Sequence, residues 1–68
     1  MEYTFGQILK ELRLEKNLTQ IELAKQLDVG KATISEWENN IYEPNLSKLK
    51  IIAQFFGVSI DYLAGLED

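Results

Sequence analysis

The stretch Thr19–Asn40, TQIELAKQLDVGKATISEWENN, predicts two short helices joined by a corner of three residues. Thr19 and Glu22 match a capping box, in which the hydroxyl binds the amide three residues on and the carboxylate binds back to the amide of the cap. The helix that follows has its apolar residues on one face, at Leu23, Ala24 and Leu27. The pattern breaks at Asp28-Val29-Gly30 and resumes at Lys31. Because so short a corner leaves no room for antiparallel packing, we expect a helix, a tight turn and a helix.

The second helix of this pair is expected to have one packed face and one polar face. Ile34 and Trp37 lie three residues apart and can pack back on the first helix. Ala24 favours this packing, since only a small side chain lets two helices approach closely at a steep crossing. An interface role is the alternative for Trp37, but its spacing favours the core. The residues left outside the packed face are Lys31, Ala32, Thr33, Ser35 and Glu36. They stand on a rod that is about as wide as the major groove of DNA.

Residues along nearly the whole chain match a known family. The matching positions are Leu18-Thr19-Gln20, Leu23-Ala24, Leu27, Val29, Thr33-Ile34-Ser35, Trp37-Glu38-Asn39, Pro44, Phe56-Gly57-Val58-Ser59 and Asp61-Tyr62-Leu63. On these residues the chain resembles the Cro/phage-repressor (XRE) helix-turn-helix family, from about Phe5 to Leu66. Asp28 departs from the glycine that is usual in the turn, and Gly30 from the serine that usually precedes the recognition helix. Aspartate tolerates the left-handed conformation and glycine is an acceptable N-cap, so we expect the fold to be retained.

The resemblance implies a compact, all-α, lambda repressor-like domain of five helices over residues 1–68, in which the second helix of the pair reads bases in the major groove. The expected base contacts are Lys31, Ala32, Thr33 and Glu36. Lysine would favour guanine, glutamate would accept from cytosine, and the methyl groups would touch thymine. The expected contacts to the DNA backbone are Gln20, Ser35, Asn39, Tyr42, Ser47 and Lys48. Two alternatives stay open: the polar face is merely solvated, and Tyr42 packs on the next helix.

The start of the chain repeats the capping pattern. Thr4 and Gln7 form a second capping box, which predicts a helix to about Lys16. The buried residues of this helix are expected to be Phe5, Leu9 and Leu12. Arg13 would then lie at the edge of the core, and the resemblance implies an ion pair between it and Glu38. The alternative is that the arginine is solvated or contacts a phosphate.

The C-terminal half predicts two further helices after a loop over residues 41–44. Asn40 is expected to end the preceding helix in the left-handed conformation, and Asn45 to cap the next helix, which Gly57 ends. The expected buried face of this helix is Leu46, Leu49, Ile52, Ala53 and Phe56. Ser59 would cap a short last helix that Gly65 closes.

Composition excludes several classes of function. The 68 residues make one domain. The absence of cysteine and histidine argues against disulfides, thiolate or zinc sites and a general base near neutral pH. A serine–lysine pair at Ser35 and Lys31 would lack oxyanion donors, so we expect no catalytic residue, metal or cofactor. No apolar run approaches the roughly 20 residues of a membrane span, and the start MEYTFG is no signal peptide. We therefore expect a cytoplasmic protein with no membrane partner.

The net charge is unusual for a protein that binds DNA. Seven basic residues against eleven acidic ones give −4, whereas DNA-binding domains are expected to be basic. Family members often carry lysine or arginine where this chain has Ile41 and Tyr42. We therefore expect weak non-specific binding and a shallow dependence on salt.

The exposed apolar residues and the last helix bear on assembly. Ile8, Leu14, Ile21, Ile51 and Phe55 lie off the predicted core stripes. Related repressors dimerise near the last helix, which implies dimer contacts at Ile60, Tyr62, Ala64 and Leu66. The leading hypothesis is a sequence-specific double-stranded DNA-binding regulator, a repressor that binds a palindromic operator as a homodimer with half-sites about 34 Å apart. The alternative is a protein-interaction module, antitoxin-like or anti-repressor, whose acidic surface has lost DNA affinity.

Overall fold

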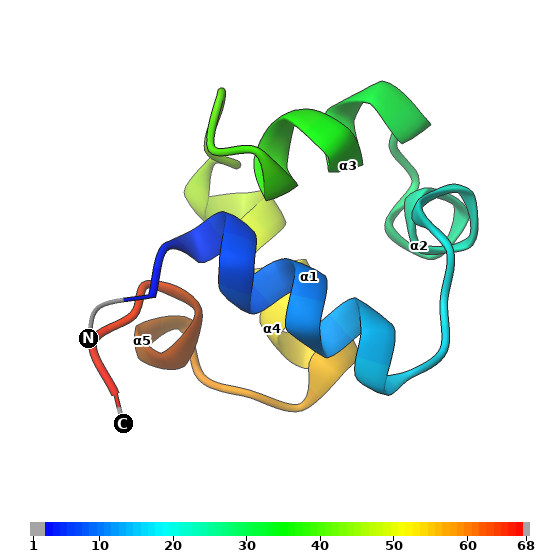
Figure 1. Ribbon diagram of the computed structural model, residues 1–68. Helices are drawn as coiled ribbons and strands as arrows, with labels where there is room; N and C mark the ends of the chain where they lie inside the picture. The colour runs from blue at the N-terminus through cyan, green and yellow to red at the C-terminus, as the bar shows by residue number, and fades with distance from the viewer. Residues whose placement is uncertain (1–2, 68) are drawn as a thin grey trace.

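The computed structural model describes residues 3–67, and every regular element in that range is a helix (Figure 1). The helices are α1 (Phe5–Glu15), α2 (Gln20–Leu27), α3 (Lys31–Glu38), α4 (Leu46–Phe56) and α5 (Ile60–Leu63). The ribbon of α1 runs across the middle of the molecule, α3 lies along one side of it, and α2 stands near its C-terminal end (Figure 1). The predicted all-α fold of five helices is confirmed.

Local side chains start four of the five helices as predicted. Thr4 and Thr19 each form a complete capping box, with Gln7 and Glu22 respectively. Asn45 accepts from the amide of Lys48, and Ser59 from that of Tyr62. Gly30 caps α3 with extended backbone but makes no side-chain bond. The start of α3 is therefore the least anchored of the five.

Left-handed residues end the helices and turn the chain. Asn17, Asp28 and Asn40 have φ of 58°, 57° and 59°, and Gly57 has φ of 69°. Asp28 thus takes the left-handed conformation, as expected at the position where the resemblance implies glycine. α1 ends at Glu15, one residue before the predicted end.

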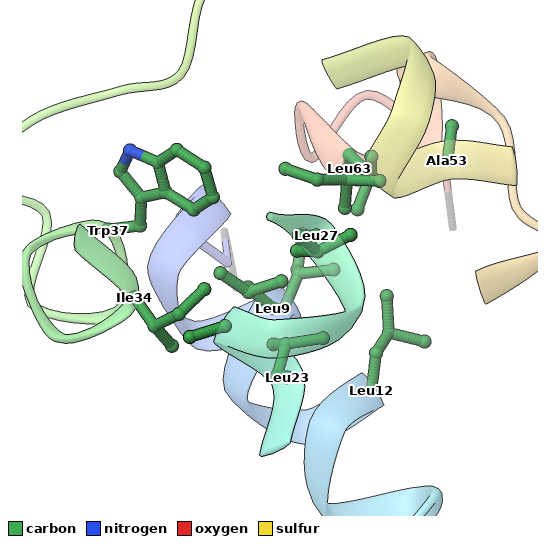
Figure 2. Packing of buried hydrophobic residues seen from close by; sticks show 11 residues of the cluster. Leu9, Leu12, Leu23, Leu27, Ile34, Trp37, Ala53 and Leu63 are labelled. Carbon is green, nitrogen blue, oxygen red and sulfur yellow. The ribbon is translucent and has the colours of Figure 1, made fainter. Parts of the chain in front are cut away.

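The core is formed by leucine and isoleucine side chains that converge from all five helices (Figure 2). Its fully buried members are Leu9, Leu23, Leu27, Ile34, Ile52 and Leu63. Trp37 is 5% exposed, so its predicted core position is confirmed, and Phe5 meets its ring edge-on at 6.5 Å between centroids. Ala24 is 3% exposed where α2 approaches α3.

Three apolar predictions were wrong. Ile8, predicted to lie off the core, is only 6% exposed, because α5 closes over that face of α1 and Gly65 lies close to the end of the Ile8 side chain. Phe55 is half-buried and packs against the core, edge-on to Phe56. Leu46 was placed in the core but is 58% exposed, because it is the first residue of α4 and lies beyond the packed turns. As predicted, Leu14, Ile21 and Ile51 are exposed.

Candidate nucleic-acid interface

The turn between α2 and α3 is closed by its own backbone. Asp28, in the left-handed conformation, reverses the chain at the end of α2, and the amide of Val29 donates to the carbonyl of Ala24 at 2.9 Å. Val29 packs against the core, so a side-chain contact stabilises the turn in addition to the backbone hydrogen bond. This geometry fixes where α3 begins.

α3 has the two faces that its sequence predicts. Ile34 and Trp37 are buried, and they point toward the leucines of α1 and α2 (Figure 2). Lys31 and Ala32 are exposed, while Thr33 is partly buried. Ser35 and Glu36 are partly buried as well. All four predicted base-reading residues therefore keep part of their surface outside the core.

A buried ion pair anchors the C-terminal end of α3. Nε of Arg13 donates to Oε2 of Glu38 at 2.6 Å and an Nη atom to Oε1 at 3.0 Å, while the other Nη donates to the carbonyl of Leu18 at 2.9 Å. Only 9% and 4% of the two side chains are exposed. The hydrogen bonds to Glu38 raise the pKa of Arg13 above its ordinary value, against burial, which lowers it. The structure thus brings together the two residues that the resemblance paired.

Two of the predicted DNA-backbone contacts also hold helices together. The side-chain amide of Gln20 donates to Oε1 of Glu38 at 3.1 Å, which brings the start of α2 to the same carboxylate. Nζ of Lys48 donates to the carbonyl of Leu27 at 3.2 Å, where a cation suits the negative end of α2. Sequence reasoning missed both links, because the partners lie 18 and 21 residues apart and no local spacing signals them.

The other predicted DNA-backbone contacts lie along α3 and the loop after it. Asn39 donates to the carbonyl of Ser35 at 2.8 Å, within the last turn of α3. Tyr42 is 63% exposed and Ser47 is exposed at the start of α4. The alternative in which Tyr42 packs on the next helix has no support from this exposure.

The predicted dimer residues divide into two kinds. Ile60 and Tyr62 are partly buried and pack against the core of their own chain. Ala64 and Leu66 are exposed, the leucine at 77%. Only the second pair offers a largely free apolar surface.

The sequence profile of a helix-turn-helix family matches residues 9–63, which span the ion pair, the turn and α3. The chain belongs to this helix-turn-helix family. The resemblance to XRE-type phage repressors, drawn from scattered residues, is thereby confirmed.

Relatives of this helix-turn-helix chain include transcription regulators. It is 47% identical over 64 residues to the HTH-type transcriptional activator BcrR of Enterococcus faecalis, covering 94% of this chain and 31% of BcrR. It is 33% identical over 64 residues to the immunity repressor of Bacillus phage phi105, covering 94% of this chain and 44% of the repressor. The chain therefore spans less than half the length of either curated relative.

One solved structure matches this chain over almost the whole length of both chains. The P22 c2 repressor, solved in complex with synthetic operator 9T, superposes with a TM-score of 0.89 at 28% identity. The match covers 96% of this helix-turn-helix chain and 98% of the repressor chain. In the part of the chain that the structure describes, no helix is long and apolar enough to cross a membrane.

Proposed function

We propose that this protein is a sequence-specific double-stranded DNA-binding transcription regulator that inserts α3 into the major groove. The observation that carries the proposal is the division of α3: Ile34 and Trp37 lock one face into the core, while Lys31 and Ala32 stand free on the other. A rigid helix with a free polar edge suits base reading. The P22 c2 repressor, which shares the fold, was solved on an operator.

The base contacts follow from side-chain chemistry. Lys31 donates to the O6 and N7 acceptors of guanine, and Glu36 accepts from N4 of cytosine. Ala32 and the methyl group of Thr33 touch the methyl group of thymine. These contacts would provide specificity without any chemical step, which agrees with relatives that are transcription regulators.

The DNA-backbone contacts extend the interface on either side of α3. The proposed residues are Gln20, Ser35, Asn39, Tyr42, Ser47 and Lys48. Gln20 has a second N–H beside the one given to Glu38, and Lys48 has two donors beside the one given to Leu27. Both side chains can therefore hold their helices together and bind a phosphate at once.

Regulation would follow from occupancy of the operator by a cytoplasmic dimer. We propose that two copies meet through Ala64 and Leu66, with Ile60 and Tyr62 behind them, and that the recognition helices enter successive grooves of a palindrome about 34 Å apart. The relatives include both a repressor and an activator. Occupancy that blocks polymerase, as in a repressor, is the simpler of the two and is our proposal for this chain.

A protein-interaction module, antitoxin-like or anti-repressor, is the second candidate. Its support is the net charge of −4 together with an apolar loop, in which Ile41 and Tyr42 are 61% and 63% exposed. Lys31 opposes it, because a module without DNA affinity has no evident use for an exposed cation on the outer face of α3.

Two experiments separate the two candidates. Duplexes that bind the protein are first selected from a random library, and the affinity for the selected duplex, fluorescently labelled, is then measured by anisotropy. We expect a preferred sequence whose affinity falls at least about fivefold in Lys31→Glu, since one good base contact is worth about 1–3 kcal/mol. Lys16→Glu is the matched control, because Lys16 is exposed at the C-terminal end of α1, over the ring of Phe55, and is not among the proposed DNA contacts. Lack of binding to any duplex at low salt, or equal losses in both variants, would contradict the proposal.

A further inference from the structure

The C-terminal end of α3 is joined to the N-terminal end of α1 by the side chain of Asn40. The backbone amide of Gly6 donates to Oδ1 of Asn40 at 3.0 Å, and Nδ2 of Asn40 donates to Oγ1 of Thr4 at 3.0 Å. The partners lie 34 and 36 residues apart, so the bonds are tertiary. Gly6 is in the first turn of α1, where amides have no partner within the helix. One side chain thus satisfies an amide of α1 and ties it to α3.

Gly6 brings the two backbones into direct contact. A Cβ at this position would lie 2.4 Å from the carbonyl oxygen of Glu38 and 2.6 Å from that of Trp37, so only glycine fits without a shift of α3. The first amides of α1 carry partial positive charge and the last carbonyls of α3 partial negative charge. The contact is therefore attractive as well as close.

Asn40 is well suited to make this contact because of its backbone. Its φ of 59° is the left-handed conformation, which glycine adopts most readily and asparagine tolerates. Glycine would relieve the backbone but would remove both side-chain bonds. Replacement by glycine is therefore a clean test of the side chain.

We propose that Asn40 is a positioning residue that sets the angle at which α3 enters DNA, through Thr4 and Gly6. The inference rests on the proposed function. α3 has only 8 residues, and its first residue follows Gly30, which provides no side-chain cap. The turn and the core hold its start and its inner face. Its far end is held by two polar residues, Glu38 and Asn40, which fix how that end lies against α1. Without Asn40, α3 occupies the competent orientation for a smaller fraction of the time, and the apparent affinity falls by that fraction.

The test compares Asn40→Gly with Asn17→Gly. Asn17 has nearly the same φ, 58°, and no side-chain hydrogen bond is found for it within residues 3–67. Both variants gain the same backbone freedom, so the difference between their affinities reports the loss of the two hydrogen bonds of the Asn40 side chain. We expect the Kd for the selected duplex to rise at least about threefold in Asn40→Gly, as the competent fraction falls, and to stay unchanged in Asn17→Gly. The amide of Gly6 should also exchange with solvent faster in Asn40→Gly alone.

Asn40→Asp serves as the conservative rescue. Its carboxylate keeps the acceptor for the Gly6 amide and can accept from the Thr4 hydroxyl instead of donating to it. We therefore expect an affinity closer to that of wild type than to that of Asn40→Gly. If Asn40→Gly binds the duplex as tightly as Asn17→Gly, the proposal is overturned while the proposed function stands. If the wild type itself binds no duplex, the proposed function fails and the positioning role fails with it.

Discussion

The buried guanidinium of Arg13 is tolerated because its hydrogen bonds go to Glu38 and to the carbonyl of Leu18. The same carboxylate accepts from Gln20, so one side chain of α3 binds both α1 and α2. A buried ion pair of this kind contributes little net stability over apolar residues of similar size, but loss of one partner leaves an uncompensated charge. The cost of a substitution here therefore depends on what is left behind.

At this scale we predict that Arg13→Leu lowers the free energy of unfolding by about 3–5 kcal/mol, because Glu38 then stays buried and unpaired. The double variant Arg13→Leu, Glu38→Leu should be more stable than Arg13→Leu alone, since the stranded charge is gone. Urea unfolding followed by the fluorescence of Trp37 measures both. A double variant whose loss equals the sum of the two single losses would show that stranded charge is not the cause.

Tertiary pairs were the hardest residues to predict. Arg13 and Glu38 lie 25 positions apart, and only the resemblance paired them. The links from Lys48 to Leu27 and from Asn40 to Gly6 were not predicted at all. Such partners are set by the angle between two packed helices, which no spacing within one helix records.

Helix starts, by contrast, were predictable because their physics is local. The capping boxes at Thr4 and Thr19 join groups three residues apart, and both formed as expected. Errors arose where another element decided the burial. Ile8 is buried by α5, and Leu46 lies at an end of α4 that no element covers. Periodicity predicts the face of a helix but not how far its neighbours extend.

At the scale of the element, the cap of α2 should make stability depend on pH. Hydrogen bonds from the backbone and side chain of Thr19 lower the pKa of Glu22 below its ordinary 4.5. Because this pKa is lower in the folded than in the unfolded state, the ionised carboxylate stabilises the fold at any pH above the unfolded-state pKa. That stabilisation is lost as the pH falls through the folded-state pKa. We predict that Glu22→Gln lowers Tm at neutral pH. The difference in Tm from wild type should vanish once the pH falls below the lowered pKa of Glu22. Thermal unfolding by circular dichroism across pH measures this.

Glu43→Gln is the control for this prediction, since it removes the same charge from the exposed loop between α3 and α4. Its Tm should follow that of the wild type more closely than Glu22→Gln does. A difference between Glu22→Gln and wild type that persists unchanged in acid would assign the effect to packing rather than to the carboxylate.

For the whole molecule, the question is how a chain of net charge −4 would bind DNA, the polyanion of the proposed function. The cations are spread over the chain from α1 to α4. The loop after α3 presents the exposed residues Ile41 and Tyr42, where the family resemblance implies lysine or arginine. Few counterions would be released on binding, so affinity would come from base contacts and shape rather than from charge. We therefore expect it to discriminate well between sequences but to search DNA slowly.

Ile41→Lys should make DNA binding depend more on charge, through a new contact between the lysine and a phosphate. Because each phosphate that a cation neutralises adds about 0.9 to the slope of log K against log salt, we expect the slope to steepen by about 0.9 and non-specific affinity to rise. Gln54→Lys adds the same charge on the exposed side of α4, near its C-terminal end, and should leave the slope unchanged because this position lies outside the proposed interface. Anisotropy titrations of the selected and a scrambled duplex over a range of salt concentrations measure both variants. Equal steepening in the two would mean that net charge, rather than the position of the loop against the DNA backbone, governs binding.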